Sequence, residues 1–222
     1  MSTAGANAVV LLALKVLCTF ACTGGGNIAA AGGATCSFSA NYSFVGEQGS
    51  GYTQKDQFTN DSAAAANGVV GYGSKQWSAF PFTVDSSYTL TAASAYLSTV
   101  GKPTSDHVAY IYSDSGANTP GTAISGPSAK VPISAISSKG GWVQFNGLNA
   151  SLTSGTRYWL VIKRVSKVTD WSNYVNWWAW GAASASDTEA GSADGSTWGA
   201  SNQWVSGTIT TFVSAPASPS TP

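Results

Sequence analysis

The chain has 222 residues, a length that suits one sizeable domain with extensions or two small domains. Only 9% of its residues are charged, well below the roughly 25% of an ordinary soluble domain, and 10 basic residues balance 10 acidic ones. A protein that binds nucleic acid needs a basic surface for the phosphates, so this neutral composition disfavours nucleic-acid binding. Few charges with many Ser, Thr and aromatic residues are typical of extracellular and virion β-proteins.

The only long apolar segment covers residues 8–21. It is shorter than the roughly 20 residues that a membrane-spanning helix needs. Its length suits the hydrophobic part of a secretory signal, and Thr19–Cys22 loosely resembles a lipoprotein cleavage box. However, no basic residue precedes the segment and Lys15 interrupts it, which a signal peptide does not favour. We therefore favour an N-terminal arm or helix that packs against a neighbouring subunit, with a cleaved signal as the alternative.

All three cysteines, Cys18, Cys22 and Cys36, precede residue 37. The main part of the chain therefore has no disulfide, and a monomer keeps at least one unpaired thiol. Cys18 and Cys22 have no His or further Cys at a zinc-site spacing, so we expect no metal there.

The residues that follow also lack the pattern of an independent core. Residues 23–33 are rich in Gly and Ala and are predicted to be a flexible connector. Apolar residues alternate in 36–45, which predicts one short strand. Residues 46–73 are polar, Gly-rich and aperiodic, and we interpret them as loop and linker. The sequence thus predicts that residues 1–73 form an assembly arm.

From residue 74 to residue 213, runs of strand type recur at the spacing of an all-β sandwich, separated by turns rich in Gly, Pro and Asn. No stretch in this region has a sustained helical period. Residues 214–222 form a Pro/Ser tail that we expect to be extended. The predicted strands are Ser78–Val84, Thr89–Thr99, Val108–Tyr112, Ala129–Pro132, Gly141–Phe145, Tyr158–Arg164, Tyr174–Trp180 and Val205–Val213.

A series of short motifs follows one order along this domain: Phe82–Val84, Ser87–Thr91, Ala95–Leu97, Val100–Thr104, Ile111–Gly116, Pro120–Thr122, Gly141–Phe145, Leu152–Thr156, Tyr158–Val161 and Asp194–Trp198. In this order the chain resembles the jelly-roll β-sandwich domains of the "choice-of-anchor" type, which are similar to carbohydrate-binding modules and occur in bacterial surface proteins and phage virion proteins. The resemblance covers residues 77–213. It implies an antiparallel jelly-roll sandwich and a non-catalytic role in display, adhesion or glycan binding, and it assigns no ligand residues.

The residues offer little for catalysis. His107 is the only histidine, and no G-x-S-x-G sequence is present to carry a nucleophile. A lone His at the start of a strand is most often a solvated surface residue, and we expect this of His107. We predict that the protein is not an enzyme and has no cofactor.

An acidic cluster, Asp187, Glu189 and Asp194, lies in a Gly/Ser-rich region that could hold Ca²⁺. Because the spacing of a calcium loop is absent, we favour a solvated loop and expect no metal site.

Tryptophan is concentrated near the end of the chain. Sugars stack their apolar faces on aromatic rings and form hydrogen bonds to amides, so the glycan-binding candidates are Trp171, Trp178, Trp180, Trp198, Trp204 and Asn176. If residues 174–180 form one strand, alternation places Trp178 and Trp180 on the face of Asn176, and Val175 and Trp177 on the core face. The alternative is that these Trp residues only cover sandwich edges and loops.

The sequence thus predicts an all-β jelly-roll antiparallel sandwich with an N-terminal extended or helical arm. We expect a non-enzymatic structural protein on a virion surface, a phage capsid decoration or fibre-like protein. Its arm would contact other virion subunits, and its outward-facing sandwich could adhere or bind glycans. Such proteins are commonly symmetric homo-oligomers. The alternative is a secreted or lipid-anchored bacterial carbohydrate-binding or adhesion module at the outer cell surface.

Overall fold

The computed structural model describes residues 51–58, 65–73, 75–167, 171–181, 189–200 and 205–214. The predictions for residues 8–21, the three cysteines, the connector at 23–33, the strand at 36–45 and the tail from residue 215 on lie outside these residues. Asp187 and Trp204 lie outside them as well. Within the described residues, no helix has the length and apolar character needed to cross a membrane.

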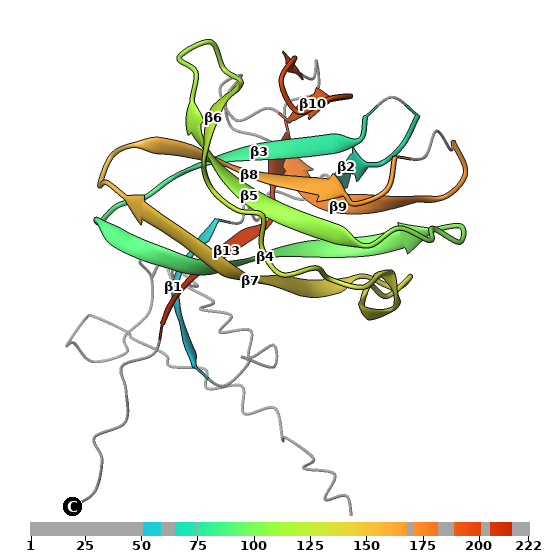
Figure 1. Cartoon of the computed structure of the whole chain (residues 1–222), viewed down its shortest axis with the longest axis horizontal. Coiled ribbons are helices and arrows are strands. Elements are labelled where there is room, and N and C mark those ends of the chain that lie inside the picture. The colour runs from blue at the N-terminus through green and yellow to red at the C-terminus, as the bar shows by residue number, and fades with distance from the viewer. Residues whose placement is uncertain are drawn as a thin grey trace, which may run out of the picture. The chain divides into compact units, whose positions relative to one another are not determined.

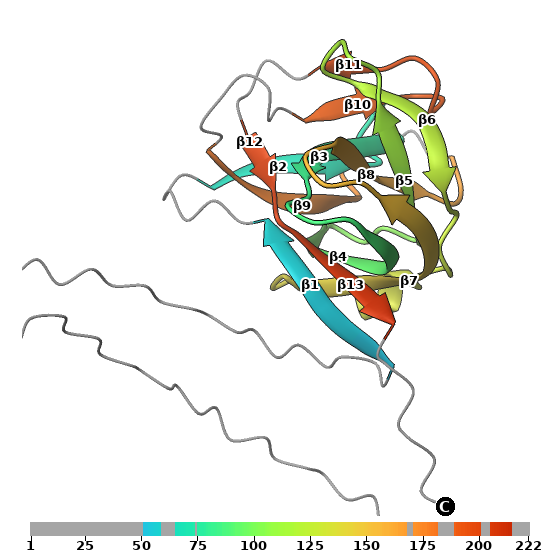
Figure 2. The ribbon, with the colours of Figure 1, turned by 90° about the vertical axis from the view of Figure 1, so that its left-hand side faces the viewer.

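The described residues form two antiparallel sheets (Figures 1 and 2). The first, called here the β4 sheet, has the order β1 (Tyr52–Phe58), β13 (Ile209–Ser214), β4 (Tyr88–Val100), β9 (Tyr174–Gly181) and β12 (Val205–Gly207), with β2 (Ala65–Val70) paired to β9 and β7 (Gly141–Leu152) paired to β4. The second, the β8 sheet, has the order β11 (Gly199–Ala200), β10 (Ala190–Ser192), β3 (Trp77–Thr83), β8 (Arg157–Arg164), β5 (His107–Asp114) and β6 (Pro120–Ser125). A short 3-10 helix covers Ile133–Ala135.

The chain passes repeatedly from one sheet to the other. Strand β3 lies in the β8 sheet, β4 in the β4 sheet, β5 again in the β8 sheet, and β7, β8 and β9 continue the alternation. Such crossing connections are typical of jelly-roll sandwiches, in which neighbours in a sheet are distant in sequence. The prediction of an all-β antiparallel sandwich is confirmed.

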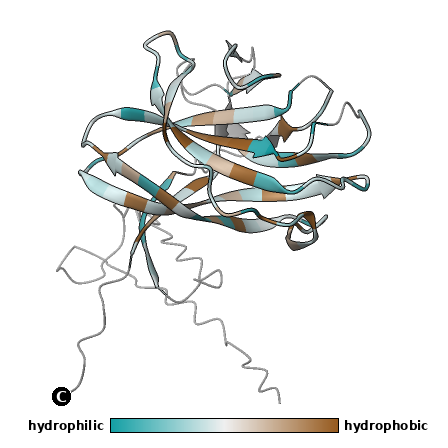
Figure 3. Ribbon diagram, in the orientation of Figure 1, coloured by the Kyte–Doolittle hydropathy of each residue, from teal (hydrophilic) through white to brown (hydrophobic). Residues whose placement is uncertain are grey.

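The inner faces of the two sheets form one core. Its largest fully buried side chains include Phe80, Phe145, Leu160 and Trp177. The Phe80 ring packs edge-on against Trp177 at 4.8 Å between ring centroids and so joins the two sheets. The predicted core position of Trp177 is confirmed. Figure 3 shows the apolar segments alternating with more polar ones along the strands.

Strand β8 is buried on both faces. Tyr158, Leu160 and Ile162 belong to the core between the sheets, whereas Trp159 and Val161 lie in a second apolar cluster on the other side of the β8 sheet. An uninterrupted apolar run is expected for a strand that is covered on both sides. The run Tyr158–Ile162 is therefore an inner strand, as its composition predicted.

Strands β9 and β13 share one edge of β4. Residues 97–100 of β4 pair with β9, and residues 92–95 pair with β13. Beyond Trp177 the strand β9 leaves β4 and pairs with β12 instead, so the segment 205–214 fills the fork between them.

Thr208 lies at this fork and is almost fully buried. Its backbone N–H and its Oγ1 hydroxyl both donate to the Trp178 carbonyl, at 3.1 and 3.0 Å. The same Oγ1 accepts from the Tyr96 backbone N–H at 3.2 Å, and the Thr208 carbonyl accepts from the Trp177 indole Nε1 at 3.2 Å. One threonine thus satisfies polar groups of both diverging strands.

Two strands precede the domain boundary that the sequence suggested. Residues 46–73 were expected to be loop and linker, but β1 pairs with β13 along Tyr52–Phe58, and β2 pairs with β9 along Ala65–Val70. The β1 sequence is polar because this strand is at the sheet edge, with alternate side chains exposed. Strand β2 contains Gly68, at which an added Cβ would lie 2.6 Å from the Phe80 ring.

Three local predictions in the main domain also differ from the structure. Residues 129–132 form no strand, and only Val131 makes an isolated bridge, with His107. Strand β7 continues through Asn146 and Gly147, beyond the predicted end of this strand at Phe145, and the β4–β7 pairing is irregular there. Strand β6 was not expected, because its side chains are mostly exposed and lack an apolar pattern.

We predict that Thr208→Val lowers the free energy of unfolding by about 2 kcal/mol, because the Tyr96 N–H and the Trp178 carbonyl lose their hydrogen bonds to the Thr208 hydroxyl while the side-chain shape is kept. Urea unfolding followed by Trp fluorescence measures the change. Thr89→Val, at an exposed position of β4, is the control and should change stability little. Equal midpoints for the two variants would contradict a bridging role for the Thr208 hydroxyl.

Candidate functional site

Three aromatic side chains cross the outer face of the β4 sheet. Tyr96 in β4 is paired in register with Trp142 in β7, and the register between β4 and β9 brings Trp178 to its other side. The Tyr96 ring lies 5.8 Å from Trp142 and 6.0 Å from Trp178, centroid to centroid, and it is nearly perpendicular to both. All three side chains are partly exposed. We call these three residues the aromatic row.

Polar groups without charge surround the aromatic row. The Gln144 side-chain amide donates to Asn146 Oδ1 at 2.7 Å. The Trp178 indole Nε1 donates to Ser98 Oγ at 2.9 Å. Asn176, paired with Ser98, is partly exposed, and its side-chain amide forms no hydrogen bond with the described part of the chain. Strands β4, β7 and β9 contain no Asp, Glu, Lys, Arg or His. The face is therefore aromatic and amide-rich but electrically neutral.

A second group of rings lies at one end of β9. Tyr72 packs edge-on against Trp171 at 4.7 Å and against Tyr174 at 4.9 Å between centroids. Trp171 is 63% exposed, although it is a large apolar residue. Its ring lies over Gly73, where an added Cβ would overlap it. We call Trp171, Tyr72 and Tyr174 the end cluster.

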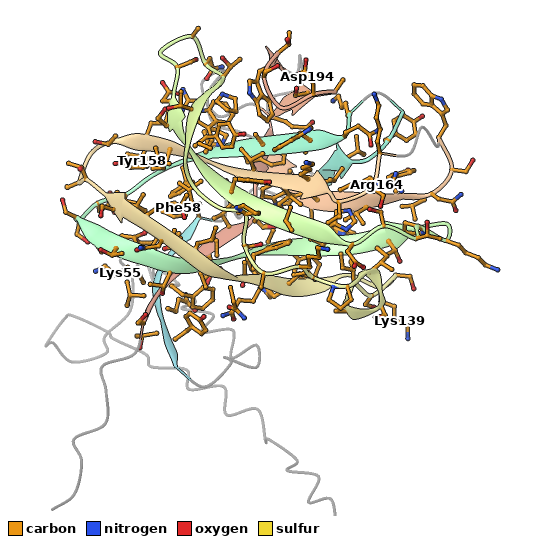
Figure 4. The ribbon with its side chains drawn as sticks, viewed as in Figure 1. Lys55, Phe58, Lys139, Tyr158, Arg164 and Asp194 are labelled. Atoms are coloured by element: carbon orange, nitrogen blue, oxygen red, sulfur yellow. The ribbon has the colours of Figure 1, made fainter. Side chains whose placement is uncertain are left out.

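Arg164 holds the two loops that carry the end cluster. This side chain is buried at the end of β8 (Figure 4), and its Nη1 donates to the Gly71 carbonyl at 2.7 Å and to the Asn173 carbonyl at 3.5 Å. Gly71 has a φ of 80°, and an added Cβ there would overlap the Arg164 side chain. Asn173 also accepts a hydrogen bond from the Lys102 N–H through its side chain. The rings of Tyr72 and Tyr174 are thus attached to fixed backbone.

His107 is not the solvated residue that we expected. Its side chain is completely buried, and neither ring nitrogen has a hydrogen-bond partner among the described residues. Burial and the neighbouring Arg164 guanidinium lower the pKa of His107 to about 4, while Asp106 acts in the opposite direction. The prediction was wrong because the register of β5 with β8 places His107 beside Arg164, and one strand alone does not reveal this.

Trp198 lies on the opposite sheet, not beside Trp178. Its ring packs against Trp77 at 6.5 Å and Tyr112 at 5.8 Å between centroids, and it belongs with the second apolar cluster on the β8 sheet. Trp159 in this cluster is fully buried and donates its indole N–H to Asp114 at 2.7 Å. Burial raises the pKa of Tyr110 and of Tyr112, so these phenols stay neutral. Trp77, Tyr110 and Trp198 are partly exposed around this cluster, and Lys163 lies over the Trp77 ring and Arg157 over the Trp159 ring, so basic side chains accompany the rings on this sheet.

Of the three acidic residues considered for calcium, the structure describes Glu189 and Asp194, and each is bonded to its own neighbours. Glu189 is buried, accepts from Ser78 Oγ at 2.7 Å and pairs with Lys75 at 3.6 Å, in contrast to the solvated loop that we expected. Asp194, beside β10 in Figure 4, accepts hydrogen bonds from the N–H groups of Thr197 and Ser196, and these lower the pKa of its carboxyl. Within the described residues, no group of three His, Cys, Asp or Glu side chains is placed to hold a metal ion.

The structure therefore divides the predicted glycan-binding candidates. Asn176 and Trp178 share the outer face of the β4 sheet, as alternation predicted, and Trp171 belongs to the end cluster. Only the backbone of Trp180 is described, in register with Ala65 and Ser206. The sequence did not single out Tyr96, Trp142 and Tyr72. The uncharged character of β4 and β7 was the signal that could have indicated the first two.

Comparisons of the chain with protein-family models, with curated proteins and with solved structures found no match.

We predict that the buried imidazole of His107 makes the fold sensitive to acid. Its pKa is lower in the folded chain, about 4, than the roughly 6.5 of an unfolded chain. Its contribution to stability is then complete above pH 6.5 and is lost as the pH falls towards 4, because only the unfolded chain binds the proton in this range. Between pH 7 and pH 4 the free energy of unfolding should therefore fall by about 3 kcal/mol because of His107.

His107→Leu isolates this effect because the other titrating groups remain. Urea unfolding of both proteins between pH 7 and pH 4 should give a difference in unfolding free energy that changes with pH by this amount. Parallel pH profiles for the two proteins would contradict the assignment.

Proposed function

We propose that the protein is a non-enzymatic display protein whose β-sandwich binds neutral glycans on the outer face of the β4 sheet. The observation that carries the proposal is the aromatic row, Trp142, Tyr96 and Trp178, on three strands that contain no charged residue. Sugar rings present apolar C–H faces that stack on aromatic side chains. Their hydroxyl groups need hydrogen-bond partners. Amide side chains both donate and accept hydrogen bonds and, being neutral, do not favour a charged ligand.

The side-chain amide of Asn176, which forms no hydrogen bond with the described part of the chain, supports this proposal further. It lies between the aromatic row and the end cluster and can both donate and accept hydrogen bonds. The neutral strands favour a neutral glycan over a phosphorylated or sulfated one, since no Lys or Arg on these strands can pair with an anion.

A catalytic role finds less support. Glycoside hydrolysis requires two carboxyl groups on either side of the scissile bond, and the aromatic row lies on strands without any. His107 is enclosed, and Glu189 is engaged with Ser78 and Lys75. We therefore propose binding rather than turnover.

For the setting, we propose a phage virion, with the residues that precede β1 contributing to attachment and the sandwich facing outward. The support is the sequence resemblance to domains found in virion proteins. Mass spectrometry of purified particles tests the setting, since an intact N-terminus on the particle is expected. An acylated Cys22 in a bacterial membrane would instead favour the lipid-anchored module.

Glycan-array binding by the full chain tests the function. We expect Trp178→Ala and Asn176→Ala each to weaken binding of the selected neutral glycan by at least tenfold. Asn176→Ala removes no internal hydrogen bond seen in the described residues, so its unfolding midpoint should match the parent protein. Ile124→Ala removes an exposed apolar side chain of the opposite sheet and is the matched control, with unchanged binding.

Two results would overturn the proposal. One is unchanged glycan binding in both Trp178→Ala and Asn176→Ala. The other is a parent protein that binds no glycan but forms an oligomer that Trp178→Ala dissociates in sedimentation analysis, since the face would then be a subunit interface.

A further inference from the structure

We infer that the ligand is a linear neutral polysaccharide that lies along β9 and contacts two separate zones, the aromatic row and the end cluster. This inference rests on the proposed function and adds to it the class of glycan and a second contact zone. Its basis is the placement of Trp178 and Tyr174 on one face of the same strand.

The distance between the two zones follows from strand geometry. Tyr174 and Trp178 are four residues apart on β9, so their Cα atoms are separated by about 13 Å at roughly 3.3 Å per residue. A mono- or disaccharide stacked on Trp178 therefore does not reach Tyr174, whereas a longer linear chain does. Two aromatic zones at this spacing suit a polymer rather than a small sugar.

The surface between the zones offers hydrogen bonds and no charge. Asn176 and Ser98 are paired at this point, and the Ser98 hydroxyl accepts from the Trp178 indole. The Asn176 amide remains available for a sugar hydroxyl. A chain that bridges the two zones therefore crosses the Asn176 amide midway.

The end cluster is built to present a ring rather than to fill a core. Trp171 keeps 63% of its surface exposed, while Tyr72 and Gly73 hold its ring in place. Arg164 fixes the carbonyls of Gly71 and Asn173, which flank this cluster. A fixed, exposed indole loses little conformational freedom when a sugar stacks on it.

Binding to both zones at once should depend on ligand length. When one zone is occupied, the other end of a long ligand is held at a high effective concentration near the second zone. A hexasaccharide therefore gains affinity from Trp171, and a disaccharide on the aromatic row does not.

Isothermal titration of the full chain with cello-, chito- and malto-oligosaccharides of two to eight units tests the inference. For the series that binds, we expect affinity to rise about tenfold or more between the disaccharide and the hexasaccharide. Trp171→Ala should remove most of this rise and leave disaccharide affinity unchanged, whereas Trp178→Ala should weaken both ligands. Trp171→Phe should retain part of the rise, and Ile124→Ala should change neither.

The outcomes separate this inference from the proposed function. If Trp171→Ala binds the hexasaccharide like the parent protein while Trp178→Ala does not, the second zone is refuted and the proposed function stands. If Trp171→Ala weakens di- and hexasaccharide equally, the ligand occupies one compact site and the inference is wrong. If neither the oligosaccharides nor the glycan array yields a ligand, the proposed function itself fails.

Discussion

The sandwich depends on how one long strand shares a single edge between two partners. Strand β4 pairs with β9 at one end and with β13 at the other, and the polar groups left between them converge on Thr208. A buried N–H or carbonyl without a partner would be costly at this point. Thr208 forms hydrogen bonds with the Tyr96 N–H, the Trp178 carbonyl and the Trp177 indole N–H. Strand β9 can therefore turn away from β4 while Trp177 remains in the core. The outward direction of Trp178 follows from the same arrangement.

Both sheets carry aromatic residues on their outer faces, in different electrostatic surroundings. On the β8 sheet, Trp159 is fully buried and Trp198 closes over Trp77 and Tyr112. On the β4 sheet, the rings of the aromatic row stay partly open, and none of the three strands beneath them carries a charge. Aromatic content and partial exposure therefore do not distinguish the two outer faces. The difference lies in charge, because Arg157 and Lys163 accompany the rings on the β8 sheet and no charged residue lies on β4, β7 or β9.

Local sequence patterns correctly predicted the features that a single strand determines, such as the face to which each side chain points. Alternation over residues 174–180 correctly separated Val175 and Trp177 from Asn176 and Trp178, because side chains on a strand point to opposite faces in turn. Contacts between distant segments could not be predicted in this way. Strand β1 is polar because it is an edge, so it lacked an apolar pattern, and the burial of His107 follows from its register with Arg164. The position of Trp198 depends on which sheet its loop covers, and no local pattern contains that information.

The absence of charge from β4, β7 and β9 also affects how the outer face responds to its surroundings. Salt weakens interactions between exposed charges, and at about 0.15 M ionic strength their range is only about 8 Å. Stacking on Trp178 and hydrogen bonding to Asn176 involve no ion pair that salt could screen. Attachment through this face would therefore keep nearly the same strength in dilute fresh water and in concentrated brine. The proposed display role, outside a cell where ionic strength is not regulated, would benefit from binding whose strength does not depend on salt.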